Sequence, residues 1–267
     1  MLKIGLLGVG AIGRAIAIAV DQKQVNADLV ALADQDRERA ILLAAELQSR
    51  PAVVSLEELL ERSDVAVEAA SQAALADFVP KALARGRDML IMSVGGLLGR
   101  HEWFRQADEK GCRIYVPSGA IAGLDGIKSA SIGRIEVAEL TSRKPVAALR
   151  GSKYVVDRGI SLDGLKQETT IFEGPAEEAA RAFPATSNVA ASLRLAVEPS
   201  APVCVRVVAV PGGSENIHEI RVRGEFGRLS MRIENVPSKS NPRTSQLAAF
   251  SAIATLKNLT KSLHVGT

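Results

Sequence analysis

Residues 2–13 read LKIGLLGVGAIG, and this stretch decides the fold of the N-terminal half. The apolar run before its glycines has the length of a buried strand, and residues 11–20 continue with the apolar spacing of a helix. Three glycines form a GxGxxG motif between them: Gly8 permits a tight turn, Gly10 lets a pyrophosphate approach the backbone, and Gly13 lets the helix pack closely on the strand. The predicted dinucleotide-binding loop comprises Gly8, Gly10, Ala11, Ile12 and Gly13.

A second apolar run, LVALAD at 29–34, ends in Asp34 about 20 residues after the motif, where a carboxylate accepts hydrogen bonds from ribose hydroxyls. Asp34 repels a 2′-phosphate and so favours NAD as the cofactor. NADP stays open as an alternative, because Arg37 is close enough in sequence to pair with that phosphate, although an exposed helix charge is the favoured explanation of Arg37.

Apolar runs and helical segments alternate up to about residue 120. This rhythm predicts right-handed crossovers and a parallel sheet. Ser71 and Ser93 follow two of the predicted strands, so each can either contact the cofactor at the carboxyl edge of the sheet or cap a helix. The expected strands are 2–8, 29–34, 65–71, 89–95 and 113–119, and the expected helices are 11–20, 36–48, 56–62, 73–85 and 100–110.

The second half of the chain has a different pattern. Apolar and charged residues alternate at 217–234 around the turn Gly224–Gly227, which predicts a hairpin with one polar face. A last helix starts near Pro242. Its apolar stripe must be buried and consists of Leu247, Phe250, Ile253, Leu256, Leu259 and Leu263. Further strands are expected at 134–141, 167–173 and 203–210, and helices at 123–132, 175–182 and 187–197.

The fold class is therefore α/β: an N-terminal Rossmann domain followed by an α+β domain on a mixed or antiparallel sheet. We predict a dinucleotide-binding domain at 1–120, an α+β domain at 121–240 and a last helical segment at 241–267.

Composition agrees with this reading and excludes other classes. The chain has 267 residues, 47% hydrophobic and 24% charged, so it can bury a core and is not a disordered or coiled-coil sequence. A net charge of +3 predicts neither a nucleic-acid nor a membrane partner. Two cysteines and the absence of an HExxH motif predict no metal site. With no signal-like leader or long apolar run, we expect a cytoplasmic protein.

Of the three histidines, His101 and His264 fit structural or solvated positions, whereas His218 enters the predicted hairpin after a Pro-Gly-Gly loop. A histidine there can face a crevice and transfer protons near neutral pH, or it can be an ordinary strand residue. Position alone leaves both possibilities open.

The chain resembles a known family, the L-aspartate dehydrogenases, along nearly its whole length. The SGAIAGLD and NIHEI segments are the most specific. The resemblance rests on VEAAS at 67–71, MSVGGL at 92–97, VPSGAIAGLDGIKSA at 116–130, TSRKP at 141–145, FPATSNVAASL at 183–193, NIHEI at 216–220, GEFG at 224–227 and NPRTSQLAAFSAIATL at 241–256.

The resemblance implies an NAD(P)-dependent oxidation of L-aspartate to iminoaspartate, which hydrolyses to oxaloacetate and ammonia. It implies that His218 is the catalytic acid/base, that Ala122 and Asn188 contact the cofactor, and that the protein is a homodimer. It also implies that 121–240 is the substrate-binding catalytic domain and that the helix at 241–267 returns to the dinucleotide-binding domain. The sequence departs from the family at 209–214, before NIHEI, and at FPATSN, where FPKN is commoner. The first departure can alter how His218 is presented, and the second removes a lysine near the cofactor.

Two carboxylates on a substrate require cations or convergent N–H donors. The candidate cations are Lys144, Arg143 and Arg243, although each can be an ordinary surface charge. Two other functions fit the same plan. One is an amino-acid or semialdehyde dehydrogenase of the homoserine or dihydrodipicolinate type, and the other is a non-catalytic NAD(P)-sensing protein.

Overall fold

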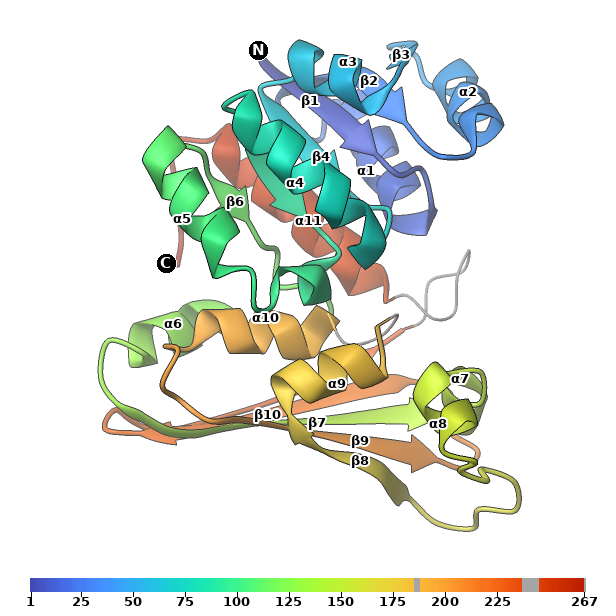
Figure 1. Cartoon of the computed structure of the whole chain (residues 1–267), viewed down its shortest axis with the longest axis vertical. Helices are drawn as coiled ribbons and strands as arrows, with labels where there is room; N and C mark the ends of the chain where they lie inside the picture. Colours follow the sequence, from blue (N-terminus) through green and yellow to red (C-terminus); the bar gives the residue numbers. More distant parts are fainter. Residues whose placement is uncertain (185–187, 237–244, 267) are drawn as a thin grey trace. The chain divides into compact units, whose positions relative to one another are not determined.

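A computed structural model describes residues 1–184, 188–236 and 245–266, and it divides the chain into two compact units (Figure 1). The first unit comprises Met1–Pro117 and Ala248–His264, and the second is built on Ser118–Leu247. The chain therefore leaves the first unit once and returns to it with its last helix.

The first unit contains a sheet of six parallel strands in the order β3-β2-β1-β4-β5-β6, which confirms the predicted parallel sheet. The order reverses between β1 and β4, so the crevice at the carboxyl ends of these two strands is the switch point at which such sheets bind ligands. The strands are β1 (Leu2–Leu7), β2 (Ala27–Ala33), β3 (Ala52–Val53), β4 (Val65–Glu68), β5 (Asp88–Ile91) and β6 (Ile114–Tyr115).

Helices cover both faces of this sheet (Figure 1). Ile4 and Leu6 point to the face that packs against α1, α2 and α11. Gly5, between them, points to the other face, where a Cβ would lie 2.7 Å from Leu59 of α3. The helical segments are α1 (Ala11–Asp21), α2 (Arg37–Glu46), α3 (Leu56–Arg62), η1 (Gln72–Ala74), α4 (Leu75–Ala84), η2 (Val94–Leu97), α5 (His101–Lys110) and α11 (Gln246–Leu259).

The last helix, α11, buries part of the predicted stripe: Leu256 is fully buried, and the half-buried Ile253 and Leu259 pack against the same core. Phe250 and Leu263 are 55% and 73% exposed, so the expectation that they are buried was wrong. Ala252, which was not in the predicted stripe, joins Leu256 in the core of the first unit, because a small alanine lets the helix approach the sheet closely. The predicted start at Pro242 lies outside the described residues.

The second unit contains a five-stranded mixed sheet in the order β11-β10-β7-β9-β8. This confirms the predicted α+β domain on a mixed or antiparallel sheet. Strands β7 and β9 are parallel, whereas the other neighbours are antiparallel. The strands are β7 (Ile135–Pro145), β8 (Thr169–Pro175), β9 (Val203–Val210), β10 (Asn216–Gly224) and β11 (Gly227–Asn235).

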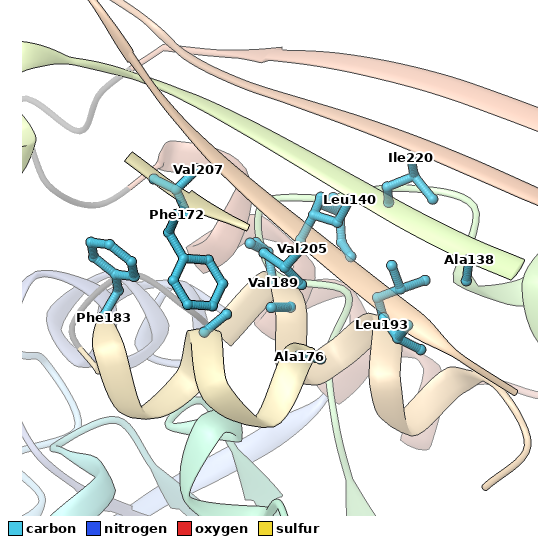
Figure 2. Close-up of a cluster of buried hydrophobic side chains, with 14 of the residues drawn as sticks. Ala138, Leu140, Phe172, Ala176, Phe183, Val189, Leu193, Val205, Val207 and Ile220 are labelled. Carbon is cyan, nitrogen blue, oxygen red and sulfur yellow. The ribbon is translucent and has the colours of Figure 1, made fainter. Parts of the chain in front are cut away.

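Helices α9 and α10 cover one face of this sheet (Figure 1). Leu140, Val205 and Ile220 from three neighbouring strands lie in one core with Leu193 of α10, and Phe172 packs edge-on against Phe183 (Figure 2). The helices of this unit are α6 (Leu124–Ala130), α7 (Val146–Leu149), α8 (Lys153–Asp157), α9 (Ala176–Ala182) and α10 (Asn188–Ala196).

The sequence did not predict β3, α7 or α8, which are all short. The strand predicted at 134–141 corresponds to β7, which continues to Pro145. Ser142, Arg143 and Lys144 are consequently strand residues whose side chains alternate between the two faces of the sheet.

The α11 packing can be tested with Leu256→Ala. Removing a fully buried leucine should lower the free energy of unfolding by about 2–5 kcal/mol. Phe250→Ala, on the exposed side of the same helix, is the control and should change it by about 0.5 kcal/mol or less. Urea unfolding of both variants measures the difference, and an equal loss in both would contradict this packing.

Candidate active site

The centre of the site is His218 on β10, which is 3% exposed and lies opposite Ser142 in the register of β10 and β7. The Oγ of Ser142 lies 2.9 Å from Nδ1 of His218. This hydrogen bond fixes the orientation of the imidazole ring and occupies one of its two nitrogens. Sequence reasoning missed Ser142, because it placed the end of the strand before that residue.

Lys144 lies on the same face of β7 as Ser142 and is 5% exposed. Among the described residues no carboxylate forms an ion pair with its ammonium group. Burial lowers the pKa of Lys144 to about 8, so the group still carries its charge at neutral pH. A buried cation that no described carboxylate pairs with is suited to binding an anionic ligand.

Burial, together with the nearby charge of Lys144, lowers the pKa of His218 to about 3. The imidazole is therefore neutral at physiological pH and has a nitrogen lone pair that can accept a proton. The protonated form is strongly disfavoured unless a negative charge arrives to compensate it.

Arg143 lies on the opposite face of β7 from Ser142 and Lys144. Its guanidinium pairs with Glu168 at 3.0 Å and with Glu219 at 2.5 Å. The expectation that Arg143 binds a substrate carboxylate is therefore corrected: this arginine belongs to the charged outer face of the sheet, and Lys144 is the cation on the side of His218. Arg243, the third candidate, lies outside the described residues.

Two asparagines, Asn235 and Asn216, lie next to this group on β11 and β10. Asn235 ends β11, and its Nδ2 donates to the carbonyl of Ala120 at 3.0 Å while its Oδ1 accepts from Ser245 Oγ at 2.6 Å. Asn235 therefore fastens the loop that carries the exposed Ala122 to the sheet. Its partner across the ladder, Asn216, is buried. Asn188 begins α10 and is half-buried.

The glycine loop of the first unit has the geometry that a dinucleotide requires. Gly8 has a positive φ of 92°, and a Cβ on Gly13 would lie 1.9 Å from the Gly8 carbonyl oxygen. A Cβ on Gly10 would meet nothing within 4 Å, which leaves open space beside the N-terminus of α1. No side chain of the described residues caps that helix end, so its first N–H groups are available to a phosphate.

Asp34 follows β2 and is half-buried. Its Oδ2 accepts from the N–H of Val9 at 2.8 Å, and its Oδ1 accepts from the N–H of Asp36 at 2.9 Å. These bonds tie the carboxylate to the glycine loop, and each oxygen keeps a further lone pair for a ribose hydroxyl. Arg37 is exposed at the start of α2.

The two serines behave differently. Ser71 is exposed and caps η1 by accepting from the N–H of Ala74 at 3.3 Å, which is the capping alternative. Ser93 is buried, caps nothing with its side chain, and donates its hydroxyl to Glu68 Oε1 at 2.8 Å. The direct role of Ser93 is thus to hold a glutamate in place.

Glu68, at the carboxyl end of β4, is a residue that sequence reasoning missed. It is fully buried, which raises its pKa, and it also accepts from the N–H groups of Ala70 at 2.8 Å and Ser93 at 3.0 Å. Gly8 packs directly against Ala69 and Ala70. One carboxylate therefore connects the ends of β4 and β5 beside the glycine loop. A charged residue inside the apolar run VAVEAAS was the available signal.

No group of three or more potential metal ligands occurs among the described residues. Within the same part of the chain, no helix is long and apolar enough to cross a membrane.

Comparison with known proteins gives the chain a family. Residues 125–259 match the family described as aspartate dehydrogenase, C-terminal, and residues 8–117 match the homoserine dehydrogenase NAD-binding domain. An L-aspartate dehydrogenase from Methanocella arvoryzae is 49% identical, and one from Methanosarcina barkeri is 48% identical, each over 100% of both chains. Another from Bradyrhizobium diazoefficiens is 38% identical over 100% of this chain and 94% of its own length.

Solved structures agree with this. The crystal structure of aspartate dehydrogenase from Thermotoga maritima matches with a TM-score of 0.75 and 25% identity over 100% of both chains. A scyllo-inositol dehydrogenase from Lactobacillus casei with bound NAD(H) shares the fold, with a TM-score of 0.57 and 12% identity. The N-terminal unit is an NAD-binding domain of Rossmann type, and the chain belongs to the L-aspartate dehydrogenase family.

Proposed function

We propose that the protein oxidises L-aspartate to iminoaspartate with NAD(P)+, and that the imine hydrolyses to oxaloacetate and ammonia. The reverse reductive amination uses the same groups. The observation that carries the proposal is the neutral, buried His218 beside the buried cation Lys144, in a chain of this family. We also expect a cytoplasmic homodimer.

His218 is the acid/base in this proposal. The α-amino group arrives as an ammonium ion, and its nitrogen must lose a proton before its lone pair can form the C=N bond. If Nδ1–H of His218 donates to Ser142 Oγ, Nε2 carries the lone pair that accepts this proton. The same nitrogen can return a proton or take one from water when the imine hydrolyses.

Lys144 binds a substrate carboxylate in this proposal. The charge of Lys144 is one cause of the low pKa of His218, so pairing it with a carboxylate removes part of that repulsion. Substrate binding should therefore make His218 more basic when a base is needed. This coupling joins recognition of the dicarboxylate to proton transfer.

The cofactor residues remain those inferred from sequence. The backbone of Gly8, Gly10, Ala11, Ile12 and Gly13 would hold the pyrophosphate. Asp34 would bind the adenosine ribose, and Ala122 and Asn188 would contact the nicotinamide end. Ser71 and Ser93 would help indirectly, by fixing the loops after β4 and β5. When bound, NAD(P)+ accepts the hydride from the substrate α-carbon.

An absorbance assay at the NADH band tests the activity. L-Aspartate with NAD+ or NADP+, and oxaloacetate with ammonia in the reverse direction, should change the NAD(P)H signal. Homoserine is the comparison substrate, because residues 8–117 match a homoserine dehydrogenase domain. Turnover of homoserine but not of L-aspartate would contradict the proposal.

The role of His218 can be tested with His218→Ala. Loss of the base should lower kcat by roughly 10²- to 10⁴-fold and leave the Kd of NADH almost unchanged. His101→Ala removes an exposed histidine on α5 and serves as the matched control, with activity expected near that of the wild type. A near-normal kcat for His218→Ala would refute the assignment.

Lys144→Met should make the protein more stable and less active. The folded-state pKa of about 8 lies below the ordinary 10.5, so keeping Lys144 charged when buried costs up to about 3 kcal/mol at pH 7. Methionine removes this cost. Between pH 8 and 10.5 the unfolded chain binds more protons than the folded one, so the advantage of the variant should shrink there.

The measurements for Lys144→Met are unfolding free energy against pH and KM for each substrate. KM for L-aspartate should rise, while the Kd of NADH should stay the same. Lys166→Met, at an exposed position, is the control and should change neither. A destabilised Lys144→Met variant with unchanged KM would show that Lys144 only supports the fold.

A further inference from the structure

Asn216, the first residue of β10, is 6% exposed, and its Oδ1 is completely buried. This oxygen has no hydrogen-bond partner among the described residues. Leaving a buried acceptor unpaired destabilises a protein, and such groups are uncommon in native structures. An orphaned acceptor at this position therefore needs an explanation.

The position of Asn216 supplies one. Side chains two residues apart on a strand point to the same face, so Asn216 lies on the side of His218. The register pairs His218 with Ser142 and Ile217 with Arg143, which makes Asn216 and Lys144 the next residues along the two strands. Cross-strand neighbours have Cβ atoms about 4.5–5.5 Å apart. Asn216, His218, Ser142 and Lys144 thus form one block of four buried polar side chains.

Within this block the polar groups divide into two kinds. Ser142 and His218 satisfy each other, and the neighbouring Asn235 uses both ends of its amide. Asn216 and Lys144 have no such partners among the described residues. The two unsatisfied groups are one acceptor and one cation, which complement an amino group and a carboxylate on the same small molecule.

We propose that Asn216 is the residue that binds the substrate's amino group, with its Oδ1 accepting an N–H hydrogen bond while Lys144 pairs with a carboxylate. This inference rests on the proposed function and adds the group that recognises the amine.

The chemistry accounts for an amide at this position. Of the three ammonium protons, one passes to Nε2 of His218 and a second remains bonded to Asn216 Oδ1. The nitrogen is then held with its lone pair free to form the C=N bond as the hydride leaves the α-carbon. An uncharged acceptor orients the amine without stabilising the ammonium form, whereas a carboxylate here would oppose its deprotonation.

Asn216→Ala tests the assignment, with L-aspartate as substrate and succinate, a dicarboxylate without an amino group, as competitive inhibitor. KM for L-aspartate should rise roughly 10- to 100-fold, as for loss of a hydrogen bond to a charged group. The Ki of succinate should change less than about twofold. Asn258→Ala, the same substitution at an exposed site on α11, is the control and should change neither value.

Asn216→Asp distinguishes binding of the amino group from a purely structural role of Asn216, because only the first predicts a change in the pH profile of kcat. This variant keeps an acceptor for the amino group, but its carboxylate also lies beside Lys144 and competes with the substrate for that cation, so the affinity for L-aspartate should return only in part. The added carboxylate stabilises the ammonium ion, so the pH profile of kcat should shift toward higher pH. Thermal unfolding and NADH binding show whether each variant is folded.

The outcomes separate the two claims. Unchanged KM in Asn216→Ala, or equal weakening of L-aspartate and succinate, would overturn the amine assignment and leave the proposed function standing. A wild-type protein that does not oxidise L-aspartate would overturn the proposed function, and the assignment with it.

Discussion

The burial of the Lys144 ammonium beside the neutral imidazole of His218 is the constraint on which the account of this site depends. Burial destabilises both charged forms, and the charge of Lys144 disfavours a second positive charge on His218. The fold keeps this arrangement because both residues extend from central strands of a five-stranded sheet with an extensive apolar core. The buried charge of Lys144 destabilises the folded protein when no ligand is bound. The same charge makes the site complementary to a carboxylate. Binding and proton transfer are therefore coupled through one electrostatic interaction.

The first unit uses a buried charge in another way. Glu68 is surrounded by donors, so its carboxylate is satisfied within the protein and fixes the chain after β4 and β5. Lys144 has no such partner among the described residues and can accept one from outside. Burial thus has two uses in the same chain: a satisfied carboxylate holds backbone segments in place, and an unsatisfied ammonium is available to a ligand.

Sequence reasoning predicted the dinucleotide-binding fold because glycine spacing and strand alternation are local properties. It could not choose between Lys144 and Arg143, since they are adjacent in sequence and only the extension of β7 to Pro145 places them on opposite faces. Phe250 was expected inside because apolar spacing does not reveal which side of a helix meets a partner. Three alanines, together with the predicted Leu256, form the buried side instead. Asn216 was overlooked because an unpaired acceptor exists only once its neighbours are known.

The most direct test of the central claim is the pH titration of His218 by NMR, with its imidazole signals assigned by comparison with the His218→Ala variant. The account predicts that His218 stays neutral from pH 8 down to about 4 in the free protein, and that succinate, by pairing with Lys144, raises its pKa. A His218 that titrates near its ordinary value of 6.5, or one whose pKa does not respond to succinate, would contradict it.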